Sequence, residues 1–153
     1  MNTKRIAAVT ACAIVFCAMC SFSQGQGRFG VGMVFGEPTG VAWKYRMNNS
    51  NAVDGAIGFE PNNNLRVHAD YLWQSHPFDE RRLSVHYGLG AAFGDTHRES
   101  DRDMGFAARG VVGLTYLVSN SPIDMFFEVA PLMIFTPDPG SDLDIGLGGR
   151  FYF

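Results

Sequence analysis

Ser84 and His86 stand two residues apart in a segment that alternates between apolar and polar residues, so both side chains point to the same side. If the preceding segment pairs with this one, Asp70 lies beside them. A hydroxyl, an imidazole and a carboxylate are the groups of a hydrolase triad. No oxyanion-hole motif accompanies them. The sequence therefore predicts no enzyme and keeps a hydrolase or acyltransferase as the alternative.

A larger set of ionisable residues shares the face that carries this constellation. Because an unpaired buried charge is costly and a paired one much less so, five cations with four carboxylates predict a salt-bridged plug. A proton- or ion-conducting path is the alternative. Folding neighbouring segments together places four pairs opposite each other: Arg46 and Asp54, Asp54 and Asp70, Asp70 and His86, and Glu128 and Arg150. The predicted charge network consists of Lys44, Arg46, Asp54, Arg66, His68, Asp70, His86, Arg109, Glu128, Asp144 and Arg150.

Strands must carry this face, because apolar residues recur with period two and no stretch has a convincing helical period. Turn-forming clusters such as Glu37–Gly40 and Pro61–Asn64 separate the segments. An even number of strands at regular spacing predicts an all-β fold, a closed antiparallel up-and-down barrel. The eight predicted strands are 28–36, 41–47, 52–60, 65–74, 83–94, 104–118, 123–135 and 143–153.

The opposite face of these strands is bulky and apolar, and it carries no charged residue. In a soluble barrel this face would be the core, whereas in an outer-membrane barrel it would contact lipid while the charged face fills the lumen. About a dozen aromatic side chains do not fit inside a narrow eight-stranded barrel, whereas the charged face, which is rich in Gly and Ala, does fit. The sequence therefore favours a transmembrane barrel.

Aromatic residues near the predicted strand ends support the same interpretation. Two aromatic belts with aliphatic residues between them match the two interfaces of a bilayer, although strands enrich aromatic residues in general. With the N-terminus in the periplasm, one belt collects Phe35, Phe59, Phe93, Phe106 and Phe135. The other belt collects Phe29, Tyr45, Trp73, Tyr87, Tyr116, Phe127, Phe151 and Phe153.

Residues 1–23 have the three parts of a secretory signal: a positive start, an apolar run over 6–19 and small residues before Gln24. The run is short for a membrane helix, which needs about 20 residues. A lipoprotein with Cys20 lipidated, or a membrane anchor, is the alternative. All three cysteines lie in this segment, so the predicted domain 24–153 has neither a disulfide nor a thiolate metal site. The net charge of −3 argues against a nucleic-acid partner.

The chain ends on Arg150-Phe151-Tyr152-Phe153, with two aromatic residues on one face. This ending resembles the terminal strand of bacterial outer-membrane barrels, and the length and strand number of 24–153 resemble the OmpA/OmpX-like eight-stranded superfamily. The resemblance implies a monomer without a cofactor, a location in the bacterial outer membrane, and contact with its lipid bilayer. It also implies that Phe151 and Phe153 are an assembly signal read by the barrel assembly machinery.

Some features depart from this resemblance or stand apart from it. The connections are shorter than is usual in the small members of that superfamily, and Pro131 in mid-strand predicts a bulge or kink. The acidic segment 95–103 does not match a calcium-loop motif and is predicted to be a solvated extracellular loop. His76 and His97 are predicted to be solvated in polar connections.

Together these observations predict an integral outer-membrane β-barrel protein with a largely closed, salt-bridged lumen and a structural or surface-binding role. Lipid A-modifying hydrolases and acyltransferases share this architecture, so that activity is one alternative, and a narrow channel is another. The sequence does not identify an extracellular ligand.

Overall fold

The computed structural model describes residues 27–60, 64–78, 80, 82–98, 101–136 and 139–153, and it describes only the backbone of 95–98 and 101–103. The predicted signal at 1–23 lies outside the described residues.

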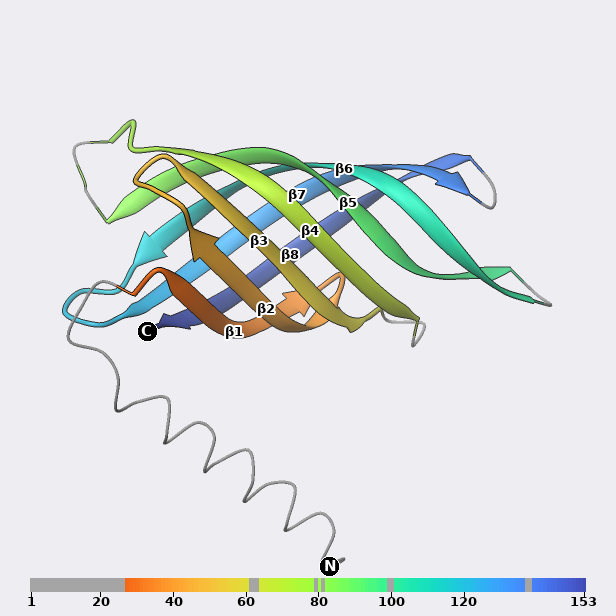
Figure 1. The fold of residues 1–153 in the computed structure, drawn as a ribbon, viewed down its shortest axis with the longest axis horizontal. Coiled ribbons are helices and arrows are strands. Elements are labelled where there is room, and N and C mark those ends of the chain that lie inside the picture. The colour runs from red at the N-terminus through yellow and green to blue at the C-terminus, as the bar shows by residue number, and fades with distance from the viewer. Residues whose placement is uncertain (1–26, 61–63, 79, 81, 99–100, 137–138) are drawn as a thin grey trace, which may run out of the picture.

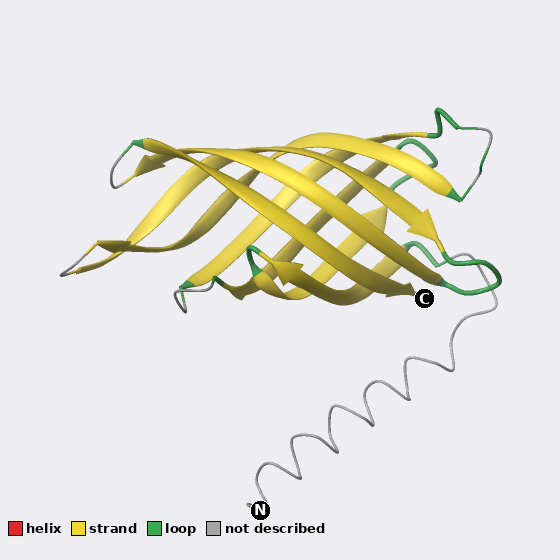
Figure 2. Ribbon diagram, turned by 180° about the vertical axis from the view of Figure 1, so that it is seen from behind, coloured by secondary structure: helices red, strands yellow, loops and turns green. Residues whose placement is uncertain are grey.

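Eight antiparallel strands close into an up-and-down barrel, in which each strand pairs with its neighbours in sequence and β1 pairs with β8 (Figures 1 and 2). This arrangement confirms the predicted all-β fold class. Within the described residues there is no helix with the length and hydrophobicity needed to cross a membrane. The strands are β1 (Phe29–Gly36), β2 (Thr39–Arg46), β3 (Asn51–Phe59), β4 (Leu65–Ser75), β5 (Leu83–Arg98), β6 (Asp101–Leu117), β7 (Ile123–Thr136) and β8 (Gly140–Tyr152).

Strands β5 and β6 are longer than predicted. Their ladder continues beyond the pair Gly94–Gly105 to the pair Arg98–Asp101. The segment 95–103, predicted to be a loop, is therefore mostly the end of a hairpin, and His97 lies in β5 rather than in a connection. Backbone hydrogen bonds can hold two antiparallel strands together even where apolar and polar residues do not alternate. Because this segment is polar, its residue pattern did not predict that the two strands continue.

The register around the barrel is staggered. Following the paired residues from Gly30 on β1 through β2 to β7 leads to Asp142 on β8. Across the seam where the barrel closes, Gly30 pairs directly with Tyr152. These two residues of β8 are ten positions apart, and this difference is the stagger of the barrel. Such a stagger tilts the strands relative to the barrel axis. It also brings five charged residues onto one row, which consists of Gly30, Lys44, Asp54, Asp70, Gly90, Arg109, Leu132 and Asp142.

The predicted cross-strand partners in the first half of the chain are partly wrong. Asp54 does lie opposite Asp70, which confirms that pair. However, Lys44 rather than Arg46 lies opposite Asp54. The predicted pair of Asp70 and His86 is also wrong, because Asp70 pairs with a glycine of β5. The connection between two strands sets their register, and the residue pattern of the strands does not report how that connection folds.

The predicted partner of Arg150 is wrong for the same reason. Arg150 on β8 lies opposite Asp124 on β7, and Glu128 lies opposite a glycine of β8. A shift of four residues keeps every side chain on its face, since the side-chain period of a strand is two. The face of Glu128 was therefore predictable, and its partner was not.

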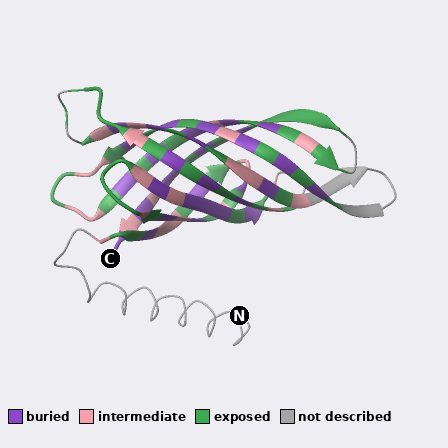
Figure 3. Ribbon diagram, turned by 45° about the horizontal axis from the view of Figure 1, so that its top comes forward, coloured by how far each residue is buried: buried purple, intermediate pink, exposed green. Residues whose placement is uncertain are grey.

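Side chains alternate between the interior and the exterior along the described strands, as Figure 3 shows. Large apolar side chains point outward and are exposed, for example Leu89 at 66% and Met133 at 61%. Between the charged residues, the interior holds small apolar clusters such as that of Val34, Ala42, Ala56 and Phe126. The predicted assignment of the two faces is confirmed.

Pro131 lies in β7 without the predicted bulge. Pairing with β8 is regular through Pro131 and Leu143, and the register with β6 is the same on both sides of the proline. The missing N–H donor therefore interrupts one ladder without shifting a strand. The irregularity lies nearer the strand end, where the register shifts at Phe106 and the hydroxyl of Thr136 accepts the Phe106 N–H at 3.3 Å.

Candidate functional site: the charge network inside the barrel

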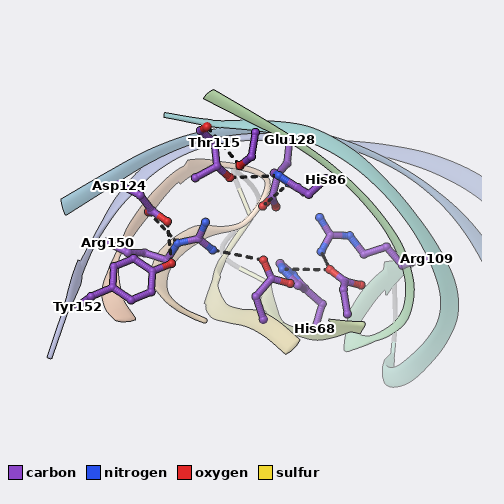
Figure 4. A network of polar contacts seen from close by, with 11 residues as sticks. His68, His86, Arg109, Thr115, Asp124, Glu128, Arg150 and Tyr152 are labelled. Atoms are coloured by element: carbon purple, nitrogen blue, oxygen red, sulfur yellow. Dashed lines mark hydrogen bonds and ion pairs between the residues drawn. The ribbon is translucent and has the colours of Figure 1, made fainter. Parts of the chain in front are cut away.

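All eleven residues of the predicted charge network point into the barrel. Nine of them are buried, and Arg46 and Arg66 are half-buried. Figure 4 shows the central part of the network, where side chains from opposite walls of the barrel converge. The contacts form four groups, each named here after one residue: Arg150, His86, Arg109 and Arg66.

Arg150 joins carboxylates from two other strands. Its Nε donates to Oδ1 of Asp124 at 3.1 Å, and its Nη1 donates to Oδ2 of Asp54 at 3.2 Å. The guanidinium also lies over the ring of Phe126, 3.9 Å from its centre. Gly148 leaves space for that ring, because a Cβ at this position would lie 2.5 Å from Cζ of Phe126. Charge pairing and ring stacking together hold the buried arginine.

Asp124 connects the Arg150 group to the end of the barrel at which the chain terminates. The Tyr152 hydroxyl donates to Oδ2 of Asp124 at 2.6 Å, and Nη2 of Arg46 lies 3.9 Å from the same oxygen. The Arg46 guanidinium lies 3.7 Å from the centre of the Tyr152 ring. Neither Asp124 nor Tyr152 belongs to the predicted charge network. The signal was present, because Asp124 has the same parity as Glu128 on one strand and therefore the same face.

His86 lies between a hydroxyl and a carboxylate. Its Nδ1 is 3.1 Å from Oγ1 of Thr115, and its Nε2 is 3.2 Å from Oε1 of Glu128. The hydroxyl of Ser84 donates to the backbone carbonyl of Thr115 at 3.5 Å. All four side chains are buried. The imidazole therefore faces Thr115, which the sequence analysis did not single out.

The hypothetical triad is not assembled in this arrangement. Asp70 accepts a hydrogen bond from Nη1 of Arg109 at 2.5 Å, and Nε2 of His68 lies 4.0 Å from the same carboxylate oxygen. The hydroxyl of Ser84 contacts a carbonyl rather than the imidazole of His86. A nucleophile needs hydrogen-bond contact with its base, and the base needs an orienting partner.

Arg109 connects the middle of the interior to the far end. Besides its bond to Asp70, its Nε lies 3.9 Å from Oδ2 of Asp144. Asp144 accepts a hydrogen bond at 2.5 Å from Nη1 of Arg66 through its other oxygen. Carboxylates and guanidinium groups therefore alternate along this part of the interior, an arrangement that leaves each charge close to one of opposite sign.

Arg66 lies where the network meets the far mouth of the barrel. It contacts three carboxylates: Asp144, Glu60, and Asp142, whose Oδ2 lies 3.5 Å from Nη2. Asp142 is 46% exposed on its side chain, so this end of the network is open to its surroundings. Partial burial raises the pKa of Glu60 just beyond β3, while the neighbouring guanidinium acts against that rise.

Lys44 is the only lysine between 24 and 153, and it is completely buried. Its Nζ has no hydrogen-bond partner among the described residues. Lys44 lies beside Asp54 in the register. With Asp124 included, five cations face five carboxylates among the interior side chains that the structure describes: Lys44, Arg46, Arg66, Arg109 and Arg150, and Asp54, Asp70, Asp124, Glu128 and Asp144.

The cavities in the described part of the interior are small. One lies under Pro38, with polar walls that include Asp54, His68 and Glu128, and it has room for about one water molecule. A second, at the mouth beside Arg66, is of similar size. Within the described residues no group of His, Cys, Asp or Glu is arranged to hold a metal ion. This geometry is that of a filled, ion-paired interior.

Comparisons with models of known protein families, with curated proteins and with solved structures found no match. The function is therefore argued from the barrel and its two faces.

Proposed function

We propose that this chain is an integral outer-membrane β-barrel protein whose lumen is closed by the charge network, with a structural or surface-binding role. The observation that carries the proposal is the distribution of side chains between the two faces. Most of the large apolar side chains lie outside, whereas Lys44, Arg150 and Asp124 are buried inside. Soluble monomers rarely expose an apolar surface of this extent to water, whereas a barrel that spans a bilayer needs such a surface to contact lipid.

The aromatic belts support the same proposal. Rings that the sequence placed in one belt contact each other in the barrel. Phe29 and Phe153 have ring centres 5.7 Å apart, and those of Trp73 and Tyr87 are 5.9 Å apart. At the other rim, the rings of Phe106 and Phe135 stack at 6.2 Å. Aromatic side chains are enriched at both interfaces of membrane-spanning barrels.

The C-terminal residues are proposed to be the signal for the barrel assembly machinery. Phe151 and Phe153 lie on the outer face, with ring centres 6.4 Å apart. The backbone N–H of Phe153 donates to the carbonyl of Phe29 at 3.1 Å, so the last residue also closes the seam between β8 and β1. A partner in the membrane can reach both rings, since neither is buried.

Insertion into lipid vesicles tests the membrane proposal. Leu89→Arg should impair insertion, because a cation near the middle of the bilayer costs about 2–4 kcal/mol on the lipid face of such barrels. Leu89 is 66% exposed on the outer face, so in water the same change would be harmless. Ser119→Arg, in the exposed turn after β6, is the matched control and should insert normally.

Two outcomes would overturn the membrane proposal. One is a protein that stays folded and monodisperse in buffer without detergent, which would make the barrel a soluble one. The other is insertion of Leu89→Arg with the stability of the wild type. Cell fractionation and a heat-modifiability gel give an independent answer, because a membrane barrel migrates differently before and after boiling.

The alternatives have less support from the geometry. Asp70 is held by Arg109 rather than by His86, which weakens a lipid A-modifying hydrolase or acyltransferase. The filled interior weakens a narrow channel. Activity on labelled lipid A that is lost in Ser84→Ala would favour the enzyme. Steady single-channel conductance in planar bilayers would favour the channel.

A further inference from the structure

The wall of the barrel is much lower on one side than on the other. Strands β1 and β2 have 8 residues each, whereas β6 has 17 and β7 has 14. In Figure 1 the turn between β1 and β2 lies well short of the end of the barrel at which β8 begins. The upper end of the barrel is here the end with the turn between β1 and β2, and the lower end is the one with the C-terminus. Within the described residues β1 pairs with β8 only over Gly146–Tyr152, so the part of β8 from Gly140 to Ile145 extends above the end of β1.

The apolar outer surface has the same asymmetry. On β1 the outward residues run from Phe29 to Phe35, and on β7 they run from Ile123 to Phe135. At about 3.3 Å per residue these spans measure about 20 Å and about 40 Å along the strand. With a tilt of about 45°, they correspond to apolar heights of about 14 Å and about 28 Å. The usual apolar band of such barrels is about 25 Å.

The difference lies at the upper rim, because the outward runs of β1 and β7 begin close together at the lower rim. Ile123 pairs with Phe151, and the ring of Phe29 contacts that of Phe153. At the upper rim, Phe35 pairs with Leu147, which in turn pairs with Phe127, so the apolar run of β7 continues for eight more residues beyond this row, to Phe135. The predicted upper belt is therefore stepped rather than flat.

Polar groups mark the upper limit of hydrocarbon on the low side. The N–H of Glu37, just beyond β1, donates to the carbonyl of Ile145 at 3.0 Å. Above this bond, the N–H of Leu143 donates to Oδ1 of its own neighbour, Asp142, at 2.8 Å. An unpaired strand edge that carries a charged carboxylate is expected outside the hydrocarbon. Inside the hydrocarbon, every backbone N–H and C=O needs a hydrogen-bond partner within the protein.

On the high side, apolar residues continue above this level. Met133 and Phe135 on β7 and Met104 and Phe106 on β6 are 46–61% exposed on the outer face. These side chains gain from contact with hydrocarbon. A flat bilayer of uniform thickness cannot satisfy both sides of the barrel.

We propose that the low wall formed by β1 and β2 binds a locally thinned bilayer, so that this face selects short or compressed acyl chains. The inference rests on the proposed membrane function. A bilayer accommodates a short apolar surface by thinning beside it. Alternatively, the whole barrel tilts in a bilayer of uniform thickness. Such a tilt would align the stepped upper rim with one membrane surface, but the lower rim would then no longer be parallel to the other surface.

Spin labels can measure the depth of each wall, since 24–153 contains no cysteine and single-cysteine variants can be labelled cleanly. Phe35→Cys and Phe135→Cys place a label at the top of the low wall and of the high wall. Phe29→Cys and Ile123→Cys are the matched pair at the lower rim. All four side chains are partly exposed on the outer face. The depth of each nitroxide follows from its accessibility to oxygen and to a water-soluble relaxant.

Thinning predicts equal depths within the upper pair and equal depths within the lower pair. If Phe35→Cys reports a position deeper than Phe135→Cys by roughly 10 Å, the bilayer is uniform and the proposal is wrong. Unequal depths within the lower pair would show a tilted barrel and would also overturn it. If no label enters hydrocarbon, the membrane function itself fails, and that result is distinct from the other two.

Vesicles of graded thickness provide a second measurement that needs no label. Wild-type insertion into phosphatidylcholine vesicles should be greatest with 12- or 14-carbon chains and several-fold lower with 18-carbon chains. Lengthening the hairpin by Thr-Val before Gly36 and by Ala-Val after Thr39 preserves the alternation of faces and should shift the optimum to thicker bilayers. Equal wild-type insertion at every thickness would overturn the proposal.

Discussion

The two ends of the barrel interior each contain an arginine among carboxylates, but in different surroundings. Arg150 is 2% exposed and is held by Asp54, Asp124 and the ring of Phe126. Arg66 lies at the open mouth, and one of its three carboxylates, Asp142, is 46% exposed. Solvent replaces a lost partner at the mouth and cannot do so in the interior. The comparison predicts that similar ion pairs contribute very differently to stability.

The largest effect is expected for Asp124→Ala. The change removes a partner from the buried Arg150, and it leaves the Tyr152 hydroxyl and Arg46 without their common acceptor. Breaking a buried pair in this way costs about 3–5 kcal/mol. Urea unfolding of the barrel in lipid vesicles measures it.

The control for this prediction is Glu80→Ala. Glu80 is 60% exposed and lies 3.8 Å from Arg82, so its loss should cost less than about 1 kcal/mol. A double-mutant cycle of Asp124→Ala with Arg150→Ala adds a sharper test, because the double variant leaves neither charge alone. It should therefore cost less than the sum of the two singles. Strict additivity would show that the two residues do not interact.

An intermediate effect is expected for Glu128→Gln. The side chain keeps its size but loses the charge that faces Nε2 of His86 at 3.2 Å. A buried polar group that loses its partner costs about 1–3 kcal/mol. The free energy of unfolding in vesicles is again the measurement. A loss as large as that of Asp124→Ala would mean that the His86 group, rather than the Arg150 group, dominates the stability of the interior.

Deletion of Phe153 should separate assembly from stability at the end of the barrel that holds Arg150. The ring is only half-buried, so the refolded barrel should lose less than the roughly 1.5–3 kcal/mol of a fully buried phenylalanine. In cells, the outer-membrane level should fall steeply if the terminal aromatic residue is an assembly signal. Quantitative blots of membrane fractions test this, and unchanged levels would refute the signal.

The smallest effect is expected for Arg66→Ala at the open mouth. Asp142 is exposed to solvent and the buried Asp144 keeps Arg109 3.9 Å away, so the expected cost is about 1 kcal/mol. The cost should shrink further at high salt, which screens exposed pairs but not buried ones. Urea unfolding at low and high salt measures both values. A cost of 3 kcal/mol or more, or one that salt does not change, would erase the contrast with Arg150.

The residue pattern predicted which face each charged side chain occupies. Parity placed Lys44, Glu128 and Arg150 on one face, because a side-chain period of two does not depend on which strands pair. The bulk of the opposite face then placed this face inside, since a narrow eight-stranded barrel does not enclose about a dozen aromatic side chains. The same parity rule applies to Asp124, although the predicted network did not include it. The fold class followed from the alternation itself.

Only the tertiary structure decided which charges meet. Arg150 reaches Asp54 across the interior, although 96 residues separate them in sequence. That contact depends on the closure of β1 against β8 and on the ten-residue stagger around the barrel. Connections and closure set the register, and they leave no trace in the alternation of the strands. The sequence therefore determined the inside and the outside of this protein and the unequal lengths of its strands, while barrel closure decided which charges form ion pairs.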